Sequence, residues 1–194
     1  FISQFELDDN RRKPKLVAVT GASPKAGTTT VAAGLAATLS ETGDGNVLYV
    51  DMNLSSGAAH PFHQGRPVCG LIEAFEDQAE RPELVSEHLY MVRAATSNGR
   101  LARAMPRRFS HLVPKMKASD YDYIVFDMPP VEQTSVTSSL VGFMDYVLLV
   151  AEAEKSSLEV TRRAVRQLQE SKANVVGVLN KTRSWVPKSL DPEA

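Results

Sequence analysis

Six short apolar runs recur along the chain and constrain its fold more than any other feature of the sequence. They cover residues 15–20, 46–51, 88–94, 121–129, 146–152 and 174–181. Within them the apolar residues follow one another almost without interruption, which is typical of strands covered on both faces in a parallel sheet. Because helical stretches alternate with these runs, we predict an α/β fold, a three-layer sandwich with a parallel sheet in the middle.

Two of the stretches between the runs have the composition of helices. Residues 29–43 are rich in alanine and leucine and end at Gly43, a residue type that commonly stops a helix. Residues 156–172 form an amphipathic pattern. The face that we expect to pack on the sheet carries Leu158, Thr161, Val165 and Leu168.

The length of the chain, 194 residues with 43% hydrophobic residues, is enough for one compact domain. We assign this domain to residues 15–183. Residues 1–14 are expected to be an N-terminal tail or docking segment, and residues 184–194 a C-terminal tail.

The stretch "VAVTGASPKAGTTTVAAGLA", residues 17–36, joins the first run to the first helix through a glycine-containing loop. Such loops direct backbone N–H groups and the positive end of a helix dipole at one point, which suits a phosphate group. The phosphate-binding motif reads G-x-x-x-x-G-K-[ST]. We assign Gly21 and Gly27 to its glycines and Thr29 to the hydroxyl that ligates Mg²⁺, so that Thr28 stands where the motif has lysine.

An uncharged Thr28 in the lysine position predicts a weakened nucleotide site. A hydrogen bond to a charged group contributes roughly 1.5–3 kcal/mol, or about one to two decades of affinity. Phosphoryl transfer depends on positioning and charge neutralisation, so the rate is expected to fall as well. Lys25, three residues earlier in the loop, is the candidate replacement for the missing charge, and its alternative interpretation is a solvated loop lysine.

Two aspartates lie at the ends of strand-like runs. Asp51 ends the second run, and Asp127 lies near the end of the fourth. Ligands of open parallel sheets bind beyond the carboxyl ends of the strands. We therefore expect the glycine loop, Asp51 and Asp127 to converge on one crevice.

Three segments together resemble the bacterial tyrosine kinases of capsule and exopolysaccharide assembly (BY-kinases), a branch of the MinD/ParA-like P-loop proteins. The loop "TGASPKAGTTT" is similar to the family's Walker A motif, T-S-x-x-P-G-E-G-K-S-T. The segment "VDMNLSSGAAHP" resembles the Walker A′ motif, with Asp51 retained and Asn53 in place of the second aspartate. The segment "YDYIVFDMPP" is an almost complete match to the Walker B motif, and the resemblance continues to about Lys181.

This resemblance implies a P-loop NTPase-like fold, a site for ATP and Mg²⁺, and a membrane polysaccharide co-polymerase as partner. It implies that Thr29, Asp51 and Asp127 ligate Mg²⁺ if the nucleotide binds. The cofactor-binding residues that it implies are Pro24, Lys25, Ala26, Gly27, Thr28, Thr29, Thr30 and Asn180. Asp51, Asp127 and Lys25 are the vestigial candidates for catalysis.

We expect the protein to be a BY-kinase-like pseudokinase, a regulatory or assembly partner in bacterial exopolysaccharide biosynthesis and export with weak or absent ATP hydrolysis and kinase activity. No tyrosine follows Tyr146 in this sequence, so a tyrosine-rich phosphorylated tail is not expected in it. Two alternatives stay open. One is an active ATP-dependent tyrosine autokinase with a variant Walker A motif, and the other is a pole-marking scaffold like the ParA-like proteins of pilus assembly, which also carry threonine in the lysine position.

Composition argues against several other classes of protein. The formal net charge of −1 gives no case for nucleic-acid binding, and the single cysteine, Cys69, leaves no disulfide framework. His60, His63 and Cys69 do not have the spacing of a zinc site. No apolar run reaches the roughly 20 residues of a membrane span. We expect a cytoplasmic protein held at the inner membrane through its partner, with self-association into a homo-oligomer left open.

Overall fold

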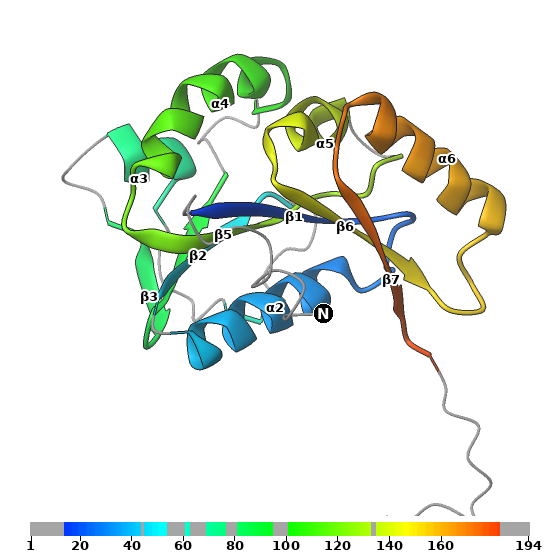
Figure 1. The fold of residues 1–194 in the computed structure, drawn as a ribbon, viewed down its shortest axis with the longest axis horizontal. Coiled ribbons are helices and arrows are strands. Elements are labelled where there is room, and N and C mark those ends of the chain that lie inside the picture. Colours follow the sequence, from blue (N-terminus) through cyan, green and yellow to red (C-terminus); the bar gives the residue numbers. More distant parts are fainter. Residues whose placement is uncertain are drawn as a thin grey trace, which may run out of the picture.

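The computed structural model of this protein is built around one seven-stranded sheet (Figure 1). It describes residues 14–43, 45–53, 61–62, 69–76, 81–94, 101–132 and 135–182, with the backbone alone for residues 101–106 and 135. The strands are β1 (Lys15–Gly21), β2 (Asn46–Asp51), β3 (Glu83–Ser86), β4 (Leu89–Arg93), β5 (Tyr121–Asp127), β6 (Tyr146–Glu152) and β7 (Val175–Asn180). Their order in the sheet is β3-β4-β2-β5-β1-β6-β7.

The prediction of a parallel α/β sheet is confirmed for six of these strands. Every neighbouring pair from β4 to β7 is parallel, and only β3 runs antiparallel, at the edge beside β4. The sequence analysis did not predict β3. Its four residues alternate between half-buried and exposed, and Leu84 is 56% exposed, so β3 lacks the continuous apolar run that marks the inner strands.

Helices cover both faces of the sheet, which makes the three layers that the sequence predicted (Figure 1). The helices are α2 (Thr28–Thr42), α3 (Leu71–Glu76), α4 (Leu101–Lys117), α5 (Ser135–Leu140) and α6 (Leu158–Glu170), and the 3-10 turn η2 (Val141–Phe143) follows α5. In Figure 1, α2 lies alone on one face, and α3 to α6 lie on the other. The core is correspondingly split into two hydrophobic clusters, one on each face of the sheet.

The amphipathic stretch 156–172 contains the helix α6, and the face predicted to be buried is confirmed at Val165 and Leu168 but not at Leu158. Leu158 is 64% exposed, whereas Ala164 and Leu168 are buried in the cluster between α6 and the sheet. Val165 packs against that cluster from its edge. Leu158 is the first residue of α6, and the turn that carries it lies off the cluster, so its apolar side chain remains in solvent.

The register of the central strands determines which residues meet at the carboxyl edge of the sheet. Asp51, the last residue of β2, is the direct neighbour of Asp127, the last residue of β5. Asp127 in turn lies beside Val19 of β1, two residues before the strand gives way to the glycine loop. The predicted convergence of the loop and the two aspartates on one edge is therefore confirmed.

Candidate functional site

The loop between β1 and α2 has the backbone geometry of an anion-binding site. Gly27 adopts a left-handed conformation with φ +92°, and a Cβ at this position would lie 2.2 Å from Nδ2 of Asn180, so only glycine fits. The N–H group of Val31 is the first to donate back to the loop, to the carbonyl of Gly27 at 3.0 Å. The amides of Thr28, Thr29 and Thr30 form the first helical turn and so have no acceptor within the helix. Together with the helix dipole they favour a phosphate group.

One assignment from the sequence needs correction at this loop. Five residues, Ala22 to Ala26, separate Gly21 from Gly27, whereas the motif has four residues between its glycines. With Gly27 in the second position, the first glycine position holds Ala22. Gly21 instead ends β1, where its lack of a side chain leaves room for Thr28, whose Oγ1 lies 2.8 Å from the position of a Gly21 Cβ.

The side chains of the loop differ in how far they are exposed. Ala26 and Thr28 are buried, Thr29 is half-buried, and Pro24, Lys25 and Thr30 are exposed. Lys25 has a positive φ of 64° and projects into solvent, as expected of a solvated loop lysine. The buried Thr28 is the residue that occupies the lysine position, and its hydroxyl faces the end of β1.

Asp127 is hydrogen-bonded to the first turn of α2, directly after the loop. It is fully buried, and its Oδ2 accepts a hydrogen bond from Oγ1 of Thr29 at 2.7 Å. Its Oδ1 is buried with no hydrogen-bond partner among the described residues. The pKa of Asp127 is raised to about 7, chiefly by burial and in smaller part by the charge of Asp51, while the hydrogen bond from Thr29 opposes the rise.

The segment that follows Asp127 is held against β1, which keeps this carboxylate in place. The N–H of Met128 donates to the carbonyl of Val19 at 2.9 Å, and Oγ1 of Thr20 donates to the carbonyl of Pro129 at 2.8 Å. Thr137 donates to the same Pro129 carbonyl at 2.9 Å. The "DMPP" sequence thus has a structural role, because its hydrogen bonds fix the end of β5 beside the loop.

Asp51 is buried as well, but both of its carboxylate oxygens have partners. The N–H of Asn53 donates to Oδ1 at 3.0 Å, and Nε of Arg93 donates to Oδ2 at 3.2 Å. The sequence analysis did not identify Arg93. Its position at the end of a strand, the same feature that identified the aspartates, could have identified it. Arg93 is the last residue of β4 and the direct neighbour of Asp51 in the sheet.

A second group of polar side chains reaches the loop from β6 and β7. Nδ2 of Asn180 donates to the carbonyl of Ala26 at 3.0 Å, and Nζ of Lys181 donates to the carbonyl of Lys25 at 2.9 Å. Lys181 also lies 3.1 Å from Oε2 of Glu152, whose Oε1 lies 2.8 Å from Nζ of Lys155. The hydrogen bonds from these two ammonium groups lower the pKa of Glu152. Of the four side chains Glu152, Lys155, Asn180 and Lys181, only Asn180 was assigned to the site from the sequence.

The donor set around Asp127 fits a Mg²⁺ ion that accompanies a nucleotide. A buried carboxylate oxygen without a partner is the ligand that such an ion requires, and a threonine hydroxyl stands beside it. Thr29 and Asp127 would hold the ion, and Asp51 would do so only by giving up part of its contact with Arg93. Such an ion would neutralise charge on the phosphates of the nucleotide. The described residues contain no cluster of three or more His, Cys, Asp or Glu that could hold a metal without such a nucleotide.

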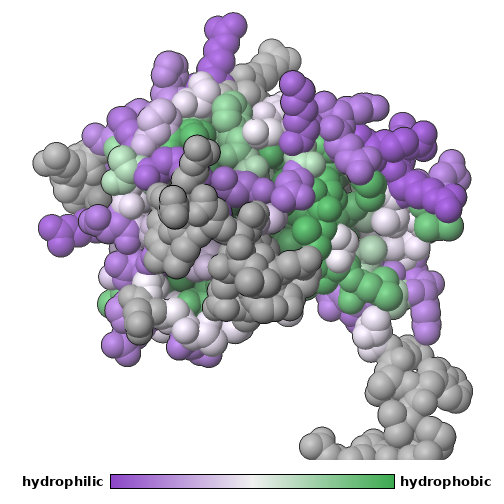
Figure 2. Space-filling model, viewed as in Figure 1, coloured by the Kyte–Doolittle hydropathy of each residue, from purple (hydrophilic) through white to green (hydrophobic). Residues whose placement is uncertain are grey.

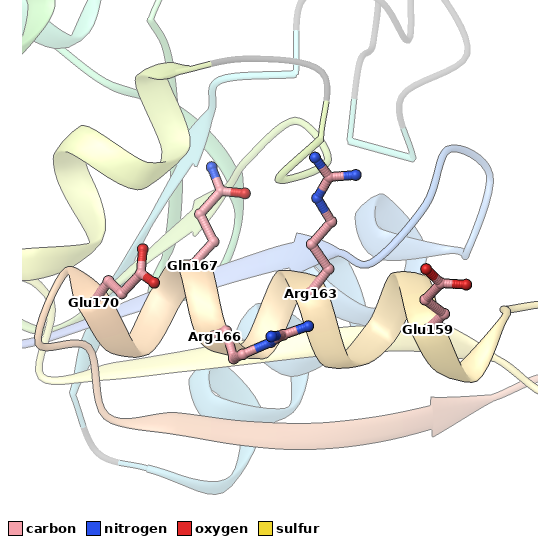
Figure 3. A pocket seen from close by; sticks show the side chains of 5 residues that line it. All are labelled: Glu159, Arg163, Arg166, Gln167 and Glu170. Atoms are coloured by element: carbon pink, nitrogen blue, oxygen red, sulfur yellow. The ribbon is translucent and has the colours of Figure 1, made fainter.

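A separate polar hollow of about 620 Å³ lies along α6 (Figure 3). Its lining residues are Glu159, Arg163, Arg166, Gln167 and Glu170. Nε2 of Gln167 donates to Oγ of Ser138 on α5 at 2.8 Å, so part of this lining is a contact between helices. None of the residues at the glycine loop lines this hollow.

Two other expectations from the sequence concern zinc binding and membrane-spanning helices. His60 and His63, which we did not expect to bind zinc, lie outside the described residues. Within the part of the chain that the structure describes, no helix combines the length and the apolar character that crossing a membrane requires.

Comparison with solved structures shows which proteins share this fold. The kinase domain of the Escherichia coli tyrosine kinase ETK superposes with a TM-score of 0.75 at 21% identity, over 95% of this chain and 74% of that one. The VpsO kinase domain gives a TM-score of 0.77 at 22% identity, over 92% and 89% of the two chains. A ParA family ATPase from Chlorobium tepidum gives 0.64 at 22% identity, over 87% and 74%.

Sequence comparison finds relatives among bacterial tyrosine-protein kinases, although no protein-family model matches the sequence. EpsB of Ralstonia nicotianae, whose assignment as a tyrosine-protein kinase is provisional, is 28% identical over 181 residues, which is 91% of this chain. The tyrosine-protein kinase YwqD of Bacillus subtilis is 23% identical over 181 residues and is covered over 76% of its length. The chain spans about a quarter of the length of EpsB, 24%. This protein therefore has the α/β fold of the ParA-like P-loop ATPases, and its relatives in sequence are bacterial tyrosine kinases.

Proposed function

We propose that this protein is a BY-kinase-like module with an impaired nucleotide site, which acts as a regulatory or assembly partner in bacterial exopolysaccharide biosynthesis and export. The observation that carries the proposal is the position of Thr28. It is the first residue of α2 and only 6% exposed, and its hydroxyl faces Gly21. An uncharged side chain therefore fills the place from which the motif's lysine reaches the phosphates.

The other cations near the loop do not make up for this loss in the described structure. The ammonium of Lys181 is shared between the carbonyl of Lys25 and the carboxylate of Glu152. Lys25 itself is exposed. Arg93 is bound to Asp51, so it neutralises a carboxylate that the resemblance assigns to Mg²⁺. Each of these arrangements weakens catalysis while leaving the backbone loop intact, which supports a module that binds nucleotide weakly and transfers phosphate slowly or not at all.

The proposed membrane partner rests on the resemblance to the BY-kinases and on the tyrosine kinases among the relatives. We place the P-loop NTPase-like domain in residues 15–183, at the cytoplasmic face of the inner membrane, bound to a membrane polysaccharide co-polymerase. We do not propose a nucleic-acid partner, because the formal net charge of −1 gives no basis for binding a phosphate backbone. The relatives with the kinase name favour this function over a pole-marking scaffold.

Calorimetric titration with MgATP tests the proposal with three proteins: the wild type, Lys25→Ala and Thr28→Lys. The wild type is expected to bind weakly, and Lys25→Ala to bind as the wild type does. Thr28→Lys is expected to bind at least about tenfold more tightly, since a charged hydrogen bond contributes roughly 1.5–3 kcal/mol. Micromolar affinity in the wild type that Lys25→Ala abolishes would establish the alternative, an active autokinase that uses Lys25. No gain in Thr28→Lys would show that the loop no longer forms a phosphate cradle.

A further inference from the structure

An apolar groove of about 410 Å³ lies between α2 and β7, on the face of the sheet that α2 covers. Its lining residues are Val31, Gly34, Leu35, Thr38, Leu148, Gly177, Val178 and Leu179. The four residues from α2 follow the i, i+3, i+4, i+7 pattern and so lie on one face of the helix. The groove is therefore bounded by a helix face on one side and by an edge strand on the other.

Nothing in the described residues fills this groove. A Cβ added at Gly34 or at Gly177 would meet no atom within 4 Å. Leu179 is 64% exposed. Figure 2 shows hydrophobic residues reaching the surface in the region that β7 crosses in Figure 1. Apolar grooves at a protein surface often mark sites where another segment binds.

The strand that borders the groove is also an open edge of the sheet. β7 pairs with β6 and has no second neighbour among the described strands. Its outer N–H and C=O groups are a template for another extended segment, and proteins commonly cover such edges with their own chain. The groove and the edge together are suited to a segment that brings both backbone and apolar side chains.

We propose that the segment following Thr182, residues 183–194, docks in this groove with Trp185 as its apolar anchor. The structure describes the chain as far as Thr182, two residues after β7 ends. The next residues read "RSWVPKSLDPEA", with Trp185, Val186 and Leu190 as the apolar side chains. Three extended residues span about 10 Å, so a chain that turns back after Thr182 brings Trp185 beside Leu179. A buried tryptophan removes roughly 150–250 Å² of surface from water, and Leu179 offers it an exposed apolar side chain to pack on.

Pro187 is compatible with this position because proline is tolerated in edge strands. The docked segment also has a consequence for the loop. Along the chain, Asn180 and Lys181 lie between Leu179, which lines the groove, and the segment 183–194, and both donate to loop carbonyls. Covering β7 holds these two residues against Ala26 and Lys25.

Trp185 is the only tryptophan in this 194-residue sequence, so the fluorescence of a protein with this sequence reports on this segment alone. We expect the emission of the native protein to be shifted to the blue of the urea-unfolded protein. We also expect quenching by acrylamide to be several-fold weaker in the native state, at all protein concentrations. Native emission and quenching equal to those of the unfolded chain would overturn the proposal. Protection that disappears on dilution would overturn it in favour of a second copy of the chain.

Two matched pairs of variants locate the protected site. Gly34→Leu fills the groove from α2 and is expected to expose Trp185 to acrylamide, whereas Gly34→Ala adds one methyl group and leaves Trp185 protected. Leu179→Asp is expected to expose Trp185 as well, and Leu84→Asp, on the opposite edge of the sheet, is its control. Gly34→Leu favours the helix, so it keeps the test valid if Leu179→Asp fails to fold. Protection of Trp185 unchanged in Gly34→Leu, or lost equally in Leu84→Asp, would place the segment elsewhere and overturn the proposal.

Discussion

Asp127 is expected to make the stability of this protein fall as the pH rises through the neutral range. Burial raises the pKa of this carboxyl from its ordinary 3.8 to about 7 in the folded protein. Between these two values the folded state binds a proton that the unfolded state has released. The free energy of unfolding therefore decreases with rising pH across this window, and the full cost is present above pH 7.

The size of the effect follows from the two pKa values. At roughly 1.36 kcal/mol for each pKa unit, the carboxylate costs about 4 kcal/mol once it is fully ionised. Most of the change falls between pH 5 and pH 8, where the contribution of Asp127 to the free energy of unfolding is expected to drop by about 2.5 kcal/mol. The groups that face Asp127 are Asp51, whose charge adds to the rise, and the hydroxyls of Thr29 and Tyr49, which oppose it.

Asp127→Asn removes this titration and keeps the shape of the side chain. Urea unfolding of the wild type and the variant at pH 5, 6, 7 and 8 without Mg²⁺ gives the difference in free energy of unfolding at each pH. The variant is expected to gain on the wild type by about 2.5 kcal/mol from pH 5 to pH 8. Asp120→Asn, at the exposed start of the same segment, controls for the loss of one carboxylate and is expected to follow the wild type. Wild-type and Asp127→Asn curves that run parallel over this range would refute the reasoning.

Three further predictions concern the metal ion, the loop and the entry to β1. Millimolar ATP is expected to raise the urea midpoint of the wild type at pH 7.5 more with Mg²⁺ than with EDTA, and this effect of Mg²⁺ is expected to be lost in Asp127→Asn; equal effects of Mg²⁺ in the two proteins would remove Asp127 from the donor set. Gly27→Ala is expected to lower the free energy of unfolding by about 1–3 kcal/mol because of its positive φ and its approach to Asn180, whereas Gly34→Ala, in the open middle of α2, is expected to raise it by about 0.5–1 kcal/mol. Asp145→Ala is expected to cost about 2 kcal/mol in urea unfolding, because it strips partners from the N–H of Leu16 and from Lys117, and Asp145→Asn, which keeps an acceptor for Leu16, is expected to cost less. Equal losses in both Asp145 variants would show that the hydrogen bond to Leu16 contributes nothing.

Much of the fold could be predicted from the sequence because the inner strands are covered on both faces. Continuous apolar runs marked β1, β2, β4, β5, β6 and β7, and the rule that ligands bind at the carboxyl edge placed Asp51 beside Asp127. The short edge strand β3 carried no such run, since one of its sides meets solvent. The spacing of Leu158 predicted a core position. Periodicity does not show whether the first turn of a helix extends past the sheet beneath it, because that depends on tertiary packing.

The candidate site was predictable in its backbone and less so in its charges. Gly27 and the helix that follows it are local features, so the sequence carried a direct signal for them. The contact of Arg93 with Asp51 joins residues 42 positions apart, and that of Lys181 with Lys25 joins residues 156 apart. Such contacts depend on strand order, which no local pattern encodes. Arg93 could still have been found by asking which charged residues end neighbouring strands.

Asp145 gives the amino end of β1 a mechanical role. Its Oδ2 accepts from the N–H of Leu16 at 2.7 Å and from Nζ of Lys117 at 2.6 Å, and the same ammonium holds the carbonyl of Pro14 at 2.8 Å. These bonds lie at the amino end of β1, and the glycine loop lies at the other end of that strand. A force applied to the chain before Pro14 would therefore act first on these hydrogen bonds of Asp145 and Lys117. Such a force would have to break these bonds, and then the pairing of β1 with β5 and β6, before it reached the loop.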